Sequence, residues 1–263
     1  MADAPDHPVA SNEVPPGPDV LVIAAHPQME HSRVNRRLMR AAAQRHADAD
    51  TARIEVRDLY ALYPDYLIDV EAEQALLKPA RLIVWQHPIH WYSMPPLMKL
   101  WVDEVLAFGW AYGPGGHALR GKDLWLVATT GGPEASYHPD SYNRYFFDAF
   151  LPPYEQTAAL CGMRFLPPLL LHGAHRADDA EIAAHAAVYA ERLASHPNWP
   201  ELDELLYGLA CPVPTDARPD DEQGAAGRAP GHSAGHEEAR GVALDGPHTL
   251  GGSIAVPGDR GAQ

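Results

Sequence analysis

The amino-acid sequence predicts an α/β protein built on a doubly wound parallel sheet of five strands in the order 2-1-3-4-5. Short apolar runs alternate with amphipathic segments, as expected of repeated strand–helix units. Three of the runs are apolar at nearly every position, which is typical of parallel strands buried on both faces. Right-handed crossovers then give this strand order, with a ligand crevice between strands one and three.

The five expected strands are the apolar runs. They are Val20–Ala25, Arg53–Asp58, Arg81–His87, Asp123–Thr129 and Arg164–Leu171. The first, third and fourth are the continuously apolar ones. The fifth contains Pro167 and Pro168, which lack the amide donor of a central strand, so we expect it at an edge or a bulge.

The segments between the strands are expected to be helices. They are Ser32–His46, Val70–Leu77, Pro95–Leu106, Asn143–Leu160 and Ala180–Ala194. Ser32 suits the N-cap of the first helix. Pro95 and Pro96 suit the first turn of the third, where a missing amide donor does no harm.

Composition divides the chain into three parts. Residues 1–18 contain five prolines and no apolar segment of a secretory signal, and residues 208–263 form an acidic tail rich in Ala, Gly and Pro. Neither segment has enough apolar surface to offset its chain entropy, so both are expected to be disordered. Residues 19–207 remain as one folded domain of ordinary size.

The charge and the apolar runs exclude two classes of function. The formal net charge is −15 and no Lys/Arg cluster stands out, which argues against nucleic-acid binding. Runs such as Leu166–Leu171 are far too short to cross a bilayer. Cys161 ends an apolar helical pattern and is expected to be a free buried thiol, as in a reduced, cytoplasmic protein.

Three loops with different chemistry are expected at the crevice. The first carries His26, Ser32, Arg33 and Asn35 at the start of a helix, a suitable phosphate-binding set. The second, residues 89–96, offers aromatic faces for a ring system.

The third loop, residues 129–138, follows the fourth strand. It offers the hydroxyls of Thr129 and Thr130, while Gly131 and Gly132 allow close approach of the main chain. The three loops favour a flavin mononucleotide site over a dinucleotide site, because no Gly-x-Gly-x-x-Gly or Gly-x-x-x-x-Gly-Lys-Ser/Thr run occurs.

Ordinary structural roles remain open for single residues of these loops. His26 also fits a strand-end histidine, Ser32 a helix cap and Trp91 a core aromatic. The spacings His87/His90 and His172/His175 admit a metal site, but no carboxylate or thiolate pattern accompanies them, so we expect no metal.

Six runs carry a resemblance to a known family. They are 25–27 (AHP), 32–35 (SRVN), 81–88 (RLIVWQHP), 91–97 (WYSMPPL), 109–113 (GWAYG) and 129–132 (TTGG). Over about residues 19–195 the chain resembles the flavodoxin-like NAD(P)H:quinone oxidoreductases, which include DT-diaphorase. Within them it is most similar to the ancillary quinone reductase subunits of glutathione-regulated potassium efflux systems.

The resemblance implies a flavodoxin-like fold, an FMN or FAD cofactor, NAD(P)H as electron donor and a homodimer. Residues that would hold the flavin phosphate are His26, Ser32, Arg33, Val34 and Asn35. Residues along the isoalloxazine would be Ile89, His90, Trp91 and Tyr92, and those at its polar edge Thr129, Thr130, Gly131 and Gly132. The substrate entrance would be formed by Phe108, Trp110 and Tyr112.

The implied activity is two-electron, ping-pong hydride transfer from NAD(P)H to a quinone. Tyr137 would donate a hydrogen bond to the reduced flavin. DT-diaphorase has a histidine six residues after this tyrosine, where Asn143 stands here, so His138 is the candidate proton donor. The alternative is a flavin-loaded regulatory subunit without catalytic purpose, bound at the inner membrane face to the cytoplasmic region of a potassium/proton antiporter.

Overall fold

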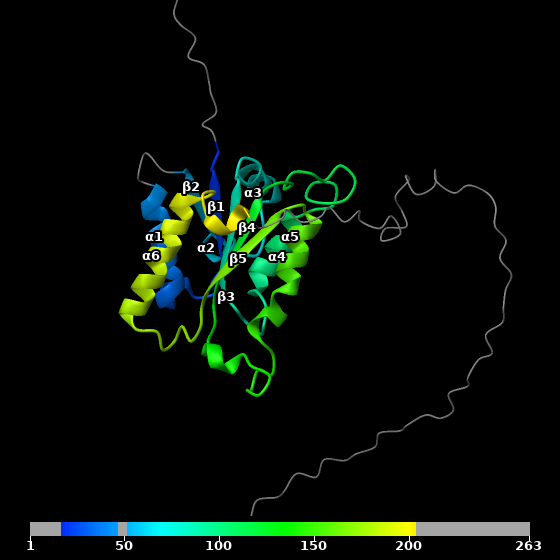
Figure 1. The fold of residues 1–263 in the computed structure, drawn as a ribbon. Helices are drawn as coiled ribbons and strands as arrows, with labels where there is room; N and C mark the ends of the chain where they lie inside the picture. The colour runs from blue at the N-terminus through cyan, green and yellow to red at the C-terminus, as the bar shows by residue number, and fades with distance from the viewer. Residues whose placement is uncertain (1–16, 47–51, 204–263) are drawn as a thin grey trace, which may run out of the picture. The chain divides into compact units, whose positions relative to one another are not determined.

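The computed structural model describes residues 17–46 and 52–203 (Figure 1). Its centre is a sheet of five parallel strands in the order β2-β1-β3-β4-β5. The strands are β1 (Val20–Ala24), β2 (Ile54–Asp58), β3 (Leu82–Pro88), β4 (Asp123–Thr129) and β5 (Arg164–Leu171). The predicted topology is confirmed, and no strand end differs from its predicted position by more than one residue.

Burial separates the central strands from the edges. Every residue of β1, β3 and β4 is buried, whereas β2 and β5 are partly exposed. In β5 the register shifts, because Leu166 pairs with Trp125 while Leu169 pairs with Val127. Two residues, Pro167 and Pro168, thus oppose one residue of β4. This is the edge strand with a bulge that the two prolines predicted.

Helices cover both faces of the sheet (Figure 1). They are α1 (Arg33–His46), α2 (Leu59–Leu62), α3 (Val70–Leu77), α4 (Pro96–Val105), α5 (Pro152–Leu160) and α6 (Asp179–Ser195). Helices α1 and α6 supply one apolar core, and α4 and α5 supply a second core on the opposite face. The alternating faces of β1 and β3 divide their side chains between these two cores, which is the doubly wound arrangement.

One helix prediction was wrong, and one short helix was not predicted. The expected helix Asn143–Leu160 is a series of turns followed by a short 3₁₀ segment, Phe147–Phe150, and α5 begins only at Pro152. Pro152 and Pro153 lack amide donors and fit only a first helical turn. The four-residue helix α2 was missed because it is too short to show a helical period.

The structure tests the expectation for Cys161 but not those for the two terminal segments. Cys161 is buried and free, as expected. The predicted extension 1–18 and tail 208–263 lie, apart from residues 17 and 18, outside the described residues.

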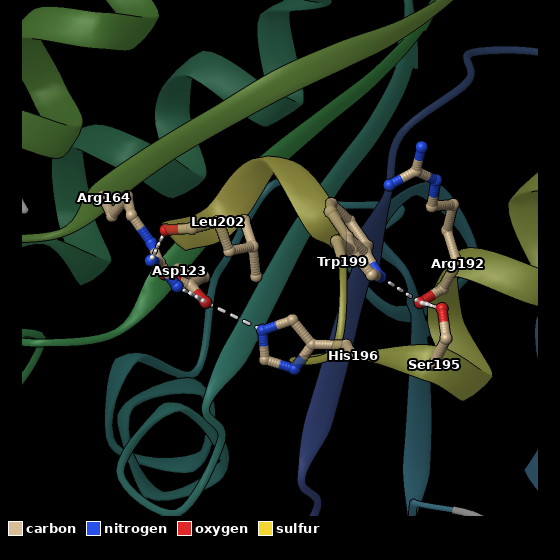
Figure 2. A network of polar contacts seen from close by, with 7 residues as sticks. All are labelled: Asp123, Arg164, Arg192, Ser195, His196, Trp199 and Leu202. Atoms are coloured by element: carbon tan, nitrogen blue, oxygen red, sulfur yellow. Dashed lines mark hydrogen bonds and ion pairs between the residues drawn. The ribbon is translucent and has the colours of Figure 1, made fainter. Parts of the chain in front are cut away.

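A buried ionic cluster fastens the segment after α6 to the amino ends of β4 and β5 (Figure 2). Arg164 donates from Nε and Nη2 to the two carboxylate oxygens of Asp123, at 2.8 and 2.9 Å. His196 Nε2 lies 2.8 Å from Asp123 Oδ2, and Arg164 Nη1 donates to the Leu202 carbonyl at 2.9 Å. The cluster leaves each Asp123 oxygen with a partner, which a buried carboxylate requires.

The cluster determines the ionisation of Asp123. Burial opposes the charged form, but the hydrogen bonds from His196 and Arg164 outweigh it and hold the pKa of Asp123 below its ordinary value. A carboxyl with a depressed pKa stabilises the fold above its unfolded pKa, and this contribution is lost as the pH falls through the folded pKa.

We therefore predict that Asp123→Asn lowers the free energy of unfolding at pH 7 by about 3–5 kcal/mol, because it leaves the Arg164 charge buried without its partner. The difference from the unsubstituted protein should shrink as the pH falls below about 3.8, the ordinary aspartate value. Urea unfolding at several pH values measures both effects. The control is Asp103→Asn, which breaks an exposed pair with Lys99 and should cost less than about 1 kcal/mol. Equal losses for both variants would contradict the assignment.

Candidate functional site

A pocket of about 440 Å³ lies at the carboxyl ends of β1, β3 and β4. Its size falls within the usual range of small-molecule sites, roughly 300–1,000 Å³. The lining residues are His26, Gln28, His31, Ser32, Arg33, Val34, Asn35, Pro88, Ile89, His90, Thr129, Thr130, Gly131, Ala174 and His175. The three loops predicted to meet at the crevice do meet there, joined by a fourth loop after β5.

The amino end of α1 forms one wall of the pocket. Ser32 Oγ accepts a hydrogen bond from the Asn35 amide at 3.1 Å, which is the predicted N-cap geometry. The hydroxyl proton of Ser32 remains available to a ligand. Since the positive end of a helix favours anions, this wall suits a phosphate group.

Asn35 contributes to the site from within the protein. It is 2% exposed, and its Nδ2 donates to Thr129 Oγ1 at 3.2 Å. Gln86 Nε2 donates to the Asn35 carbonyl at 3.0 Å, and Tyr189 donates to Gln86 Oε1 at 3.1 Å. Asn35 thus connects the α1 wall to β4 and β3, and its amide group does not act as a free phosphate donor.

Arg33 also has a partner other than a ligand. Its guanidinium donates to Asp179 Oδ1 at 2.8 Å and to the Ala177 carbonyl at 3.0 Å. The side chain lines the pocket but shares its charge with α6. Val34 is 3% exposed and packs in the core beneath the pocket wall.

The described lining of the pocket contains several histidines and no carboxylate. His26, His31, His90 and His175 all line it, and among residues 17–46 and 52–203 no Asp or Glu does, although the chain carries 35 acidic residues. Burial lowers the pKa of His26 and of His90, so both rings are neutral near pH 7. His26 Nδ1 accepts from the Gln28 amide at 3.1 Å, which leaves Nε2–H as a donor. A lining of donors without carboxylates is suited to an anionic ligand.

The loop after β3 is held in a strained turn. His90 and Ser93 exchange both main-chain hydrogen bonds, at 2.8 and 3.0 Å, and the two residues between them have positive φ, 48° at Trp91 and 66° at Tyr92. This is the backbone of a type I′ turn, which Asn-Gly normally occupies. Such strain in bulky residues persists where surrounding contacts impose it, and it gathers at functional sites.

Only some residues of this loop line the pocket. Ile89 and His90 line the pocket, and the Ile89 amide donates to the Thr129 carbonyl at 2.7 Å. Trp91 is 93% exposed at the tip of the turn, beyond the lining residues, and Tyr92 stacks on Phe150. An exposed aromatic ring beside a pocket is available to cover a flat ligand.

Glycines in the loop after β4 leave room for neighbouring side chains. A Cβ on Gly131 would lie 2.8 Å from His175 Nε2, and one on Gly132 would lie 2.6 Å from Ser136 Oγ. Thr130 Oγ1 donates to the Gly132 carbonyl at 2.7 Å, which fixes the turn. Thr129, Thr130 and Gly131 line the pocket, while Gly132 supports them from behind.

Tyr137 lies behind this loop in an aromatic cluster. Its ring centroid is 5.3 Å from those of Phe147 and His172. Burial raises the pKa of Tyr137 above its ordinary value, and the nearby Thr130 hydroxyl only partly offsets this. The phenol is therefore a protonated donor at pH 7. It lies behind Thr130, which lines the pocket, and is not itself a lining residue.

The two histidines near Tyr137 differ in position. His138 faces Phe146 and lies 3.6 Å from the exposed carboxylate of Asp140, with its ring half exposed and outside the pocket lining. His172 Nδ1 lies 3.0 Å from Thr130 Oγ1, so it reaches the Tyr137–Thr130 pair directly.

Sequence reasoning considered His172 and His175 only as a metal spacing. The described residues contain no group of three or more His, Cys, Asp or Glu that would hold a metal. The signal that identifies the pair is their place directly after β5, whose carboxyl end adjoins that of β4.

Asn143 has a structural role at the position where DT-diaphorase has a histidine. Its Nδ2 donates to Ser136 Oγ at 3.0 Å, and its Oδ1 accepts from the Tyr92 hydroxyl at 3.3 Å. Asn143 therefore holds the loops after β3 and β4 together.

The residues predicted to form the substrate entrance lie apart from the pocket. The Gly109 amide donates to the Tyr112 carbonyl at 2.8 Å, and the rings of Phe108 and Tyr112 meet edge to face at 5.7 Å. Phe108, Trp110 and Tyr112 are half-buried on a loop after α4, and none of them lines the pocket.

Comparison with known proteins agrees with this geometry. The sequence model of a family described as having a flavodoxin-like fold matches residues 18–193. The chain belongs to this flavodoxin-like family. The ancillary protein KefF of the glutathione-regulated potassium-efflux system of Citrobacter koseri is 49% identical over 174 residues, which are 66% of this chain and 94% of the relative.

Two solved structures are similar to the structure of this chain. General stress protein 14 of Treponema denticola, in complex with FMN, shares 40% identity with a TM-score of 0.61, over 67% of this chain and 98% of that one. An NADPH-quinone reductase from P. pentosaceus shares 25% identity with a TM-score of 0.58, over 68% and 98%. The resemblance to the quinone oxidoreductases is confirmed.

We predict that Asn35→Ala lowers the free energy of unfolding of the flavin-free protein by about 1–3 kcal/mol, because Thr129 loses a buried partner. Gln44→Ala, at an exposed position on the same helix, should change it by less than about 0.5 kcal/mol. Thermal and urea unfolding provide the measurement. An Asn35→Ala protein as stable as the Gln44→Ala control would remove Asn35 from the framework of the site.

Proposed function

We propose that this protein is an FMN-dependent NAD(P)H:quinone oxidoreductase. The observation that carries the proposal is the carboxylate-free pocket at the strand ends, with a helix amino terminus on one side and a strained aromatic turn on the other. The FMN complex and the NADPH-quinone reductase among its structural relatives support the same cofactor and reaction class.

The residues present fit a flavin mononucleotide. The α1 terminus, Ser32 and neutral His26 would hold the phosphate, in a lining that has no carboxylate to repel it. The main chain of Ile89 and His90 and the Thr129–Gly131 turn would hold the ring, with Trp91 and Tyr92 beside it. FAD is the alternative cofactor, and identification of the released flavin distinguishes the two.

Bound flavin supplies reversible two-electron chemistry between NAD(P)H and a quinone. The protein contributes a fixed donor, since Tyr137 stays protonated and is held in place by the surrounding aromatic rings. His172 is placed to orient this donor through Thr130. His138, more exposed, is the second candidate for proton supply. A ping-pong cycle follows if nicotinamide and quinone use the pocket mouth in turn.

We further propose a homodimer. Large aromatic side chains remain exposed on the loops around the pocket, namely Trp91, Tyr92, Tyr142, Tyr145 and Phe146. Exposed apolar surface of this kind marks interaction sites, and a symmetric partner is the commonest solution. A second copy would cover these rings and narrow the substrate entrance.

The second proposed role is that of an ancillary protein for a potassium/proton antiporter. It rests on the identity to KefF of Citrobacter koseri, which is named as an ancillary protein of a glutathione-regulated potassium-efflux system. No helix in residues 17–46 and 52–203 is both long and apolar enough to span a bilayer. We therefore propose attachment at the cytoplasmic face through the partner protein. A transport assay beside a quinone reductase assay separates a catalytic from a purely regulatory role.

The purified protein should be yellow and release FMN. Ser32→Ala should raise the dissociation constant for FMN roughly tenfold to a hundredfold, because it removes a donor to a charged group worth about 1.5–3 kcal/mol. Fluorescence titration of the flavin-free protein gives the constant, with Ser195→Ala, at the end of α6, as the control. A protein that neither carries nor takes up FMN would overturn the proposed function.

Tyr137→Phe should bind FMN normally but slow flavin reduction by NAD(P)H roughly tenfold or more, because the donor matters only as charge develops. Stopped-flow absorbance measures the rate, and Tyr145→Phe, an exposed tyrosine, is the control. His172→Ala and His138→Ala in parallel identify which histidine assists. An unchanged reduction rate in Tyr137→Phe would assign the tyrosine a structural role only.

A further inference from the structure

A second hollow, the α1–α6 groove, lies outside the flavin pocket. Helices α1 and α6 run side by side on one face of the sheet (Figure 1). Between them is a space of about 620 Å³. Its walls are Arg33, Arg36, Arg37, Arg40, Ala41 and Gln44 of α1, and Asp179, Ile182, Ala183, Ala186, Ala187 and Ala190 of α6.

The groove is basic in a strongly acidic protein. Helix α1 has five arginines and no acidic residue, while the whole chain has a net charge of −15. The expectation that no Lys/Arg cluster exists was wrong for this helix. Spacings of four and three residues bring Arg33, Arg37 and Arg40 onto one helical face. These arginines are not consecutive in the sequence, so a search for a run of basic residues does not find them.

Two of these arginines lack a partner in the described part of the chain. Arg33 is paired with Asp179, and Arg36 donates to the Glu30 carbonyl at 2.7 Å. Arg37 and Arg40 are exposed, and no hydrogen bond or ion pair joins them to another described residue. The facing stretch of α6, Ile182–Ala190, contains no carboxylate. Two helices that pack together normally place opposite charges across such a gap, so the positive charge here is left for another molecule.

We propose that the α1–α6 groove binds an acidic, amphipathic helix of a partner protein. The alanines of α6 form a low apolar floor, and helices approach closely where the contacting side chains are small. Arg37 and Arg40, the two arginines without a described partner, are about 4.5 Å apart along the helix axis, so glutamates three or four residues apart on a bound helix match them.

The net charge of the chain restricts the choice of partner. Residues 17–46 and 52–203 carry a small net negative charge, whereas the groove has arginines without carboxylate partners, so an acidic helix is attracted at the groove more than elsewhere on these residues. A long nucleic acid would meet the remaining negative charge over a much larger area. A small anion would use the arginines but leave the alanine floor uncovered.

The groove and the flavin pocket share Arg33 but are otherwise separate sites. Arg37 and Arg40 do not line the pocket, so the docking proposal does not depend on the proposed redox activity. Their substitution should leave flavin content and reductase rate unchanged.

The test uses the full chain, loaded with FMN, and a fluorescein-labelled helical peptide of about 18 residues. The peptide carries glutamates spaced four and three residues apart on one side and leucine and alanine beside them. We expect saturable binding by fluorescence anisotropy that weakens as salt is added. Arg37→Glu combined with Arg40→Glu should weaken binding roughly tenfold or more. The matched control, Lys78→Glu with Arg120→Glu, changes the net charge equally at exposed positions elsewhere and should weaken it much less.

Charge exchange makes the test specific. A peptide with lysines in place of the glutamates should bind the Arg37→Glu/Arg40→Glu protein better than it binds the unsubstituted protein. Equal weakening in both double variants, or no recovery on charge exchange, would overturn the proposal. Full displacement of the peptide by millimolar inorganic phosphate at constant ionic strength would also overturn it, in favour of a small-anion site.

Discussion

The site depends on one buried chain of hydrogen bonds that runs from Tyr189 through Gln86 and Asn35 to Thr129. These four side chains belong to α6, β3, α1 and β4, and all are buried. A buried polar group without its partner is costly, so each member fixes the next. The wall at α1 and the edge at β4 are therefore held at a constant separation across the sheet.

The two ends of the sheet divide the work between them. At the amino end, Asp123, Arg164 and His196 form a buried ionic cluster that attaches the segment after α6. At the carboxyl end, the connections that follow β1 and β3 leave toward opposite sides of the sheet, and the loops there direct hydrogen-bond donors into a pocket. The ionic cluster stabilises the fold at the end of the sheet away from the pocket. The loops at the carboxyl ends can therefore adopt the shape that a ligand needs, and ligands bind at this end in other doubly wound sheets.

The sequence predicted most of the fold and which loops line the pocket. Continuous apolar runs identified β1, β3 and β4, and two prolines identified the edge strand, because both signals are local. Arg33 and Asn35 line the pocket, but their partners Asp179 and Thr129 lie far along the chain and have no local signature. His172 was passed over for the same reason, since its role depends on Thr130, which precedes it by 42 residues.

The turn at Trp91 and Tyr92 has a consequence for ligand selection. Reciprocal hydrogen bonds between His90 and Ser93, and a bond from Tyr92 to Asn143, fix this backbone in the protein alone. A ligand then loses little affinity to loop ordering, which elsewhere costs about 0.5–1.5 kcal/mol for each immobilised side chain. The same rigidity prevents the loop from adapting its shape. A turn held in this way favours planar molecules whose shape already matches the opening over bulkier ones that would require the loop to move.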